Sequence, residues 1–256
     1  YGFAKMASSL APLDRKKKGR ALVELFGAYG WSLGLKNMKW LSDHLLVRGV
    51  NHFVPHAFSQ KEYPDFDCPP HFYARGRNPQ FRYYKQLNDY TNRLSHLLSG
   101  GTHVATAAVL YHAEAEWAGE AMYFHKPIKE LLRGQIDCDV ITADLLTESA
   151  VVRDGKLQAE GERYSCLVVP NSEALPDSLI RTMAELAEQG LALFFVEGLP
   201  GRSVEGETDN LRRLSAAGAR VVSLRRLASA LREAGYFEIE VTAASPDLRF
   251  YHVRYP

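Results

Sequence analysis

The chain has 256 residues, of which 46% are apolar and 24% charged, a composition typical of a globular protein with room for two domains. Its 31 lysines and arginines against 30 aspartates and glutamates leave a net charge of +1, which argues against nucleic acid or a membrane surface as the main partner. The three cysteines form no Cys-x-x-Cys pair, so reduced thiols are expected rather than disulfides or a cysteine zinc site.

The first hundred residues are predicted to alternate between strands and helices. The expected order is a helix over 3–18 ending in the basic run "DRKKKGR", a strand over 21–25, a helix capped by Ser32 or Asn37 and running to Arg48, a short strand in "VNHFVPHAF", a long loop over 59–79 and a helix over about 81–97. Strand, helix, strand and helix in this order imply a parallel sheet. A loop as long as 59–79 inside a compact region is usually functional.

The remainder of the chain repeats this alternation with more buried strands. We expect strands over 104–111, 138–142, 166–170, 191–198 and 219–224, and helices over 121–134, 176–188, 209–217 and 225–234. Hydrophobic strands separated by helices predict an α/β fold with a doubly wound open parallel sheet.

The stretch "ALVELFGAYGW" ends a strand on a carboxylate, Glu24, and then opens into a loop of glycines and aromatic residues. Functional groups of parallel α/β structures lie at the carboxyl ends of the strands, and His56 ends the next strand in the same way. A carboxylate surrounded by aromatic rings suits carbohydrate chemistry. The candidate substrate-binding residues are Tyr29, Trp31, Asn51, His52, His56 and Phe58, and the long loop adds Tyr63, Phe66, His71, Phe72 and Tyr73 to the same rim.

Each of these residues also has a simpler interpretation. Glu24 could be an ion-paired acid at a strand end, and the aromatic residues could belong to the core. His52 and His56 share a strand face and could bind a metal, but a third ligand is missing, so no metal is expected and hydrogen bonding to substrate or packing is favoured. No glycine-rich phosphate loop follows a strand, so no nucleotide cofactor is expected.

The segments "VELFGAYGW", "NMKWLSDHLLVRGVNHFVPHAFS" and "NPQFRYYKQLNDYTNRLSHLL" resemble the last strands and helices of a clan A glycoside hydrolase barrel, with the family 42 β-galactosidases as the nearest relatives. That family has a (β/α)8 barrel with a glutamate nucleophile at the end of strand seven, and Glu24 matches this position. "VNHFVPHAF" is similar to strand eight, where His56 replaces a residue that is usually aromatic. The sequence does not specify the sugar.

The resemblance extends beyond the barrel. "VATAAVLYHAEAEW", "YSCLVVPNSEALP" and "GLALFFVEGLPG" are similar to the glutamine-amidotransferase-like (flavodoxin-like) domain of family 42, which serves trimer formation. Amidotransferases need a cysteine on a sharp turn after a strand, whereas here Cys166 lies inside its strand and Ser172 lacks flanking glycines. A non-catalytic sheet is therefore expected. The implied domains are 1–102, the end of the barrel; 103–235, the open sheet; and 236–256, the possible start of a β domain.

The resemblance implies a retaining glycoside hydrolase with Glu24 as nucleophile and a carbohydrate substrate. The acid/base glutamate, which in clan A follows an asparagine at the end of strand four, would lie upstream of Tyr1, so the segment alone is expected to be inactive. The alternative is a non-catalytic carbohydrate-binding or assembly protein that keeps the fold. The chain begins without methionine and ends on the aromatic run "LRFYHVRYP", so both ends look cut. A cytoplasmic location is expected, although the missing start leaves a signal peptide open.

Overall fold

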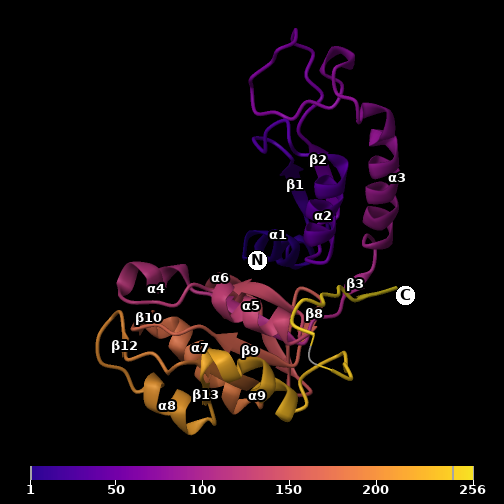
Figure 1. The fold of residues 1–256 in the computed structure, drawn as a ribbon. Helices are drawn as coiled ribbons and strands as arrows, with labels where there is room; N and C mark the ends of the chain where they lie inside the picture. Colours follow the sequence, from indigo (N-terminus) through magenta and orange to yellow (C-terminus); the bar gives the residue numbers. More distant parts are fainter. Residues whose placement is uncertain (1, 244, 256) are drawn as a thin grey trace.

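The computed structural model describes residues 2–243 and 245–255. In Figure 1 the first hundred residues, coloured indigo to magenta, form a strand and helix layer that stands above a larger α/β body made by the remainder of the chain. None of the helices in the described part is long and apolar enough to cross a bilayer.

The upper layer contains two parallel strands and the helices around them. Its elements are α1 (Gly2–Leu13), β1 (Leu22–Leu25), α2 (Leu35–Leu46), β2 (His52–Pro55), the short 3₁₀ helix η1 (Ala74–Gly76) and α3 (Phe81–Leu97). The register of β1 and β2 runs from Leu22 opposite His52 to Leu25 opposite Pro55. The predicted order of strands and helices in this region and the parallel pairing are confirmed, while the end of α1 and the start of α2 differ from the prediction.

Helix α1 is shorter than the predicted helix over 3–18. Pro12 has no N–H to donate in the last turn. Beyond Leu13 the chain turns, with the Lys17 amide donating to the Asp14 carbonyl at 2.9 Å and the Gly19 amide returning to the Ala11 carbonyl at 3.1 Å. The basic run therefore lies in a turn and not on the helix.

The start of α2 differs from both predicted caps, Ser32 and Asn37. Its N-cap is Gly34, which has no capping side chain. Instead, Oε1 of Gln80, from the segment before α3, accepts a hydrogen bond from the Leu35 amide at 2.7 Å. A Cβ on Gly34 would lie 2.9 Å from Nε2 of Gln80, so the glycine makes room for this long-range cap.

The two-stranded sheet is covered on one side only. Val23, Leu25 and Phe53 pack with residues of α2 and α3, such as Met38 and Tyr84, in a small hydrophobic core. The alternate side chains point the other way and are exposed: Leu22, Glu24, His52 and Val54. In the part of the chain that the structure describes, this sheet has no third strand, so the barrel is not closed.

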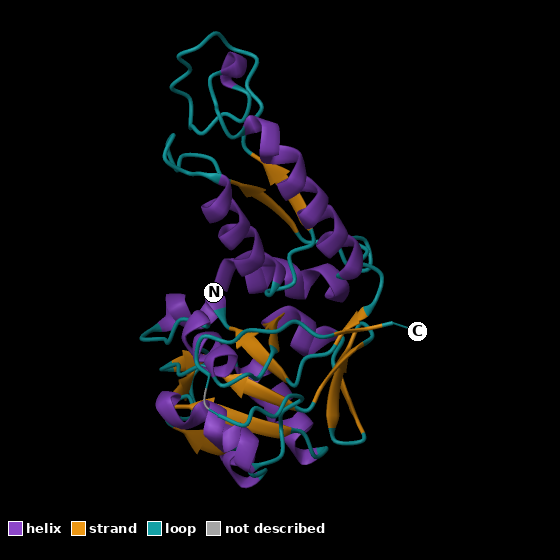
Figure 2. Ribbon diagram, turned by 45° about the vertical axis from the view of Figure 1, so that its right-hand side comes forward, coloured by secondary structure: helices purple, strands orange, loops and turns teal. Residues whose placement is uncertain are grey.

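The lower body is built on a five-stranded parallel sheet, confirming the predicted open α/β sheet. The strand order is β13 (Arg220–Val222), β11 (Ala192–Val196), β9 (Cys166–Val169), β4 (Ala107–Tyr111) and β5 (Cys138–Thr142). One face is covered by α5 (His125–Arg133) and α9 (Leu227–Glu233), and the other by α6 (Ala143–Glu148), α7 (Asp177–Glu188) and α8 (Asn210–Ala216). Figure 2 shows helices in purple packed around the orange strands of this body. Both faces of the sheet are thus buried, as expected for parallel strands.

Several short elements were not predicted. They are the 3₁₀ helix η2 (Leu224–Arg226), helix α4 (Ala113–Ala118), the antiparallel strands β6 (Val151–Arg153), β7 (Lys156–Ala159) and β8 (Glu162–Tyr164), the parallel pair β10 (Ala174–Leu175) and β12 (Arg202–Ser203), and β3 (Thr102–His103). The last of these pairs antiparallel with β14 (Val253–Arg254), so the aromatic run near the end of the chain returns to the junction between the two layers. The predicted β domain after residue 236 stays a prediction.

A buried ionic cluster joins the two layers. Nζ of Lys5, on α1, lies 3.0 Å from Asp137 and 3.6 Å from Asp139, at the start of β5. The ring nitrogens of His103 lie 2.8 Å from Asp137 and 2.9 Å from Asp139, and Tyr251 stacks on the imidazole at a centroid distance of 4.3 Å. Lys5, Asp137, Asp139 and His103 are all buried.

The cluster is balanced in charge. Burial by itself lowers the pKa of His103, but Asp139 and Asp137 outweigh it and raise this pKa to about 9. Burial opposes ionisation of Asp139, but His103 and Lys5 hold its pKa well below the ordinary value. Two cations therefore face two carboxylates away from water, an arrangement that is stable only while each charge keeps its partners.

Candidate functional site

The carboxyl ends of β1 and β2 open into a pocket of about 350 Å³. The lining residues are Glu24, Leu25, Phe26, Gly27, Tyr29, His56 and Cys68. Of these, Glu24 is the only carboxyl group, and it is the next-to-last residue of the parallel strand β1, near the carboxyl end where α/β structures place their functional groups. Glu24, Tyr29 and His56, three of the predicted site residues, are thus brought together.

The loop after Glu24 adopts an unusual backbone. Phe26 and Ala28 have φ values of 84° and 64°, in the left-handed region that residues with a Cβ rarely enter. Such a residue costs about 1–3 kcal/mol and persists only where the surroundings enforce it, often at functional sites. Phe26 is held by the core, where its ring meets Phe72 edge-on at 6.3 Å. A Cβ on Gly27 would lie 3.1 Å from Cγ of His56. The absence of a side chain at Gly27 therefore lets the imidazole ring pack closely against the loop.

The long loop over 59–79 closes the other side of the pocket. Main-chain hydrogen bonds connect it to the loop after β1, from the Ala28 amide to the Cys68 carbonyl at 3.3 Å and from the Gly30 amide to the Pro69 carbonyl at 2.9 Å. The Phe72 amide also donates to the Ala57 carbonyl, after β2, at 3.0 Å. The two strand ends and the loop therefore form one connected rim.

The 59–79 loop is ordered by its own polar side chains. Oγ of Ser59 donates to Asp65 at 2.6 Å, and this bond and one from the Asp67 amide lower the pKa of Asp65. His71 is buried, with Nε2 2.7 Å from the Asp67 carbonyl and Nδ1 3.6 Å from the Asp65 carboxylate. The hydrogen bond to Asp67 and, more weakly, the charge of Glu24 raise the pKa of the Cys68 thiol. Sequence reasoning placed His71 only on the rim and missed Cys68, because neither belongs to a recognisable motif.

The remaining predicted site residues lie outside the pocket lining. Trp31 contacts the rings of Tyr63 and His71, at 5.9 Å and 5.5 Å between centroids. Phe58 stacks on Tyr73 at 6.0 Å and meets Phe81 at 5.8 Å.

Asn51 and His52 lie at the amino end of β2, at the opposite end of the sheet from Glu24. The Asn51 side chain is engaged with the main chain, accepting from the Ala21 amide at 3.0 Å and donating to the Gly19 carbonyl at 2.9 Å.

One polar atom at the pocket has no partner in the described structure. Nδ1 of His56 is buried without a hydrogen bond. Because a buried polar atom without a partner costs roughly 1–3 kcal/mol, this nitrogen is suited to a hydroxyl of a bound ligand or to a water. Among the described residues, no group of three or more His, Cys, Asp or Glu side chains could hold a metal ion.

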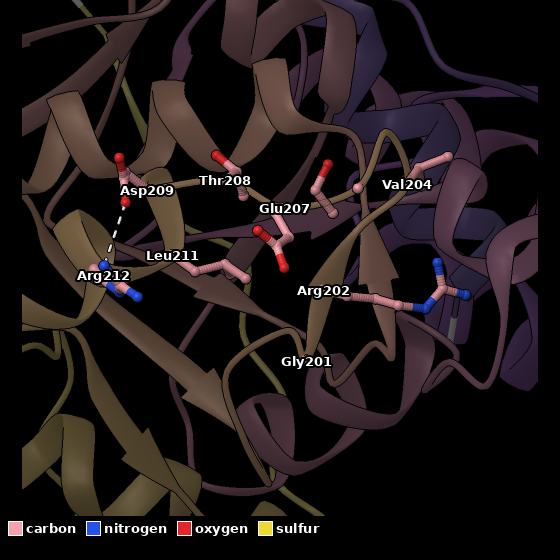
Figure 3. Close-up of a pocket in the computed structure, with 10 residues that line it drawn as sticks. Gly201, Arg202, Val204, Glu207, Thr208, Asp209, Leu211 and Arg212 are labelled. Atoms are coloured by element: carbon pink, nitrogen blue, oxygen red, sulfur yellow. Dashed lines mark hydrogen bonds and ion pairs between the residues drawn. The ribbon is translucent and has the colours of Figure 1, made fainter.

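A larger hollow lies elsewhere. About 760 Å³ of open space faces the segment 201–212 of the lower body (Figure 3). Its arginines are engaged with neighbouring acids, Arg212 with Asp209 at 3.5 Å and Arg202 with Glu173 at 3.4 Å. Its lining includes the carboxyl groups of Glu207 and Asp209 but, unlike that of the Glu24 pocket, no histidine, cysteine or aromatic ring.

Solved structures share this arrangement. The rhamnosidase from Novosphingobium sp. PP1Y is similar with a TM-score of 0.66 and 21% identity, over 91% of this chain and 24% of that protein. A family 42 exo-carrageenase from Bacteroides ovatus has a TM-score of 0.55 and 11% identity, over 81% and 28% of the two chains. Gan42B, a family 42 β-galactosidase from G. stearothermophilus, has a TM-score of 0.55 and 15% identity, over 82% and 33%. At these identities the likeness concerns the fold alone.

Sequence comparison identifies the family. None of the curated proteins compared with this chain matches it. A family model described as alpha-L-rhamnosidase matches residues 5–229. The predicted glycoside hydrolase relationship is thereby confirmed, whereas membership of family 42 is not. The chain spans about a quarter of the length of the solved rhamnosidase. The chain belongs to the alpha-L-rhamnosidase family of glycoside hydrolases, family 106.

Proposed function

We propose that this chain supplies part of the active site of a glycoside hydrolase that cleaves terminal L-rhamnose from saccharides, with Glu24 as one of two catalytic carboxylates. The observation that carries the proposal is the position of Glu24, the only carboxyl group in a pocket at the carboxyl end of two parallel strands. The sugar is taken from the family to which the chain belongs.

The exposed face of the small sheet supports a barrel. Leu22, Glu24, His52 and Val54 point to the same side and are exposed, although two of them are apolar. In a (β/α)8 barrel this side faces the other strands and is filled by side chains from them. We propose that further strands cover Leu22 and Val54 in the complete protein and leave Glu24 and His56 at the mouth of the barrel.

The second carboxylate is proposed to come from outside residues 1–256. Glycoside hydrolysis needs two carboxyl groups, about 5–5.5 Å apart in retaining enzymes and about 6.5–9.5 Å apart in inverting ones. Glu24 has no such partner among the residues that line its pocket. The retaining mechanism, with Glu24 as nucleophile, stays a prediction. NMR of the rhamnose first released tests it: an α-anomer, as in the substrate, indicates retention, and a β-anomer indicates inversion.

His56 and Tyr29 are proposed to bind the sugar beside Glu24. The free Nδ1 of His56 offers one hydrogen bond to a sugar hydroxyl. The exposed ring of Tyr29 offers an apolar face and a phenolic hydroxyl at the same pocket. The predicted roles of the lower body in homotrimer formation and as a non-catalytic sheet stay predictions.

The decisive experiment is Glu24→Gln in the complete protein, assayed on α-L-rhamnosyl fluoride. We expect kcat to fall by about 10³-fold, as for loss of a catalytic carboxylate, while calorimetry finds rhamnose binding retained. The matched control is Glu148→Gln, the same change at an exposed position of α6, and it should leave kcat unchanged.

The alternative function is sugar binding without turnover, favoured by the single carboxylate in the pocket. It predicts that the wild-type protein binds rhamnose and hydrolyses none of it. Turnover of the fluoride that survives Glu24→Gln would instead refute Glu24 as nucleophile or general base, and loss of activity on a disaccharide alone would mark it as the general acid.

A further inference from the structure

Beside the Glu24 pocket stand two exposed aromatic rings, Trp31 and Tyr63, which we call the aromatic wall. Their centroids are 5.9 Å apart at an interplanar angle of 64°. Each residue is 43% exposed, so part of the apolar surface of both rings is uncovered by the described residues. Exposed aromatic surface of this kind, next to a polar site, is typical of a ligand-binding surface.

The wall is connected to the pocket through two histidine rings. His56 lines the pocket, and its ring lies 6.3 Å from the ring of His71. The ring of His71 lies in turn 5.5 Å from that of Trp31, nearly perpendicular to it at 88°. The exposed ring of Trp31 is therefore separated from the pocket-lining His56 by a single buried side chain, that of His71.

The wall is also held in place before any ligand binds. Behind Trp31, the buried His71 is fixed by the Asp67 carbonyl at 2.7 Å and by Asp65. Tyr63 carries the guanidinium of Arg77 over its ring at 5.0 Å, which is within the range of a cation–π contact. Because these supports fix the rings, binding a flat partner costs little further conformational entropy.

We propose that Trp31 and Tyr63 form the subsite for the leaving group of the glycosidic bond, and that this group is a second sugar ring with an apolar face. This inference rests on the proposed function, since it assumes that the first sugar is bound at Glu24. His71 is a positioning residue that acts on the substrate only through Trp31. We accordingly expect the complete protein to hydrolyse rhamnosyl disaccharides or longer chains with a higher kcat/KM than simple alkyl rhamnosides.

The test compares substrates that differ only in the leaving group. α-L-Rhamnosyl fluoride cannot reach the wall, a rhamnosyl-glucose disaccharide offers a sugar face, and 4-nitrophenyl α-L-rhamnoside offers an aromatic one. In the complete protein, Trp31→Ala and Tyr63→Ala should each lower kcat/KM for the disaccharide about 10-fold and leave the fluoride within about twofold. Trp40→Ala, the same change at an exposed ring of α2, should alter neither.

The three substrates distinguish a failure of the leaving-group subsite from a failure of the sugar-ring assignment. Equal losses on disaccharide and fluoride, or no loss on either, would overturn the leaving-group subsite. A loss confined to the aryl rhamnoside would overturn the assignment to a sugar ring. His71→Asn should lower the ratio of disaccharide to fluoride kcat/KM, whereas a purely structural defect reduces both values and leaves the ratio unchanged.

If the wild-type protein hydrolyses none of the three substrates, a binding experiment still tests whether the aromatic wall binds a second sugar ring. When wild-type protein hydrolyses none of the three substrates, the proposed function is refuted, but the wall is not yet tested. With Trp40→Phe and Trp117→Phe, Trp31 becomes the only tryptophan of residues 1–256. Any other tryptophan of the complete protein is replaced in the same way. Quenching of its fluorescence by the disaccharide, and not by free L-rhamnose, supports the subsite, and an unchanged spectrum refutes it.

Discussion

Lys5→Met tests whether the buried ionic cluster holds the two layers together. The change keeps the length of the side chain and removes the ammonium group that lies 3.0 Å from Asp137 and 3.6 Å from Asp139. His103 alone then faces two carboxylates, and all three residues are buried. Removing one partner of a buried ion pair costs about 3–5 kcal/mol, because a charge is left uncompensated in a medium of low polarity.

The assay is thermal unfolding of the protein, followed by circular dichroism. A loss of about 3–5 kcal/mol corresponds to a decrease in Tm of about 6–20 °C for a chain of this size. Lys17→Met is the matched control, because Lys17 pairs with Asp14 at 3.2 Å on the exposed surface, where an ion pair contributes less than about 1 kcal/mol. If Lys5→Met and Lys17→Met lower Tm by the same small amount, the reasoning about the buried cluster is wrong.

Two further predictions concern pH and helix capping. The pKa of His103 in the folded protein, about 9, is above its ordinary value of 6.5, so its contribution to stability is complete below pH 6.5 and is lost as the pH rises towards 9. Urea unfolding at pH 6 and pH 9 should show this loss in the wild type and much less of it in His103→Gln. Gln80→Ala removes the acceptor for the Leu35 amide and should lower the free energy of unfolding by about 1 kcal/mol, whereas Gln60→Ala, an exposed glutamine without a capping role, should leave the urea midpoint unchanged.

The sequence predicted those features that depend on local pattern. Strand β1, helix α3 and strand β5 follow from apolar periodicity and short hydrophobic runs, and the structure has them where they were expected. From these, the meeting of Glu24 and His56 at one edge of a parallel sheet follows as well.

Features that depend on distant partners could not be predicted. Lys5 looks like an ordinary helix residue until Asp137 is brought to it from 132 positions away. The cap of α2 comes from Gln80. The side chain of Asn51 is hydrogen-bonded to the main chain of Gly19 and Ala21 and does not line the pocket. Periodicity carries no information about such pairs, because each is created by the tertiary fold.

The buried ionic cluster also sets an order of events during synthesis. Its members enter the ribosomal tunnel at very different times, since Lys5 belongs to the first helix and Tyr251, which stacks on His103, comes just before the last strand. At about 5–20 residues per second, translation takes on the order of 12–50 s to pass from one to the other. During that interval α1 can dock on β5, but the imidazole between the two aspartates lacks its aromatic cover. The nascent chain therefore carries a partly hydrated ionic group between α1 and β5 until Tyr251 has been synthesised and has packed on the imidazole.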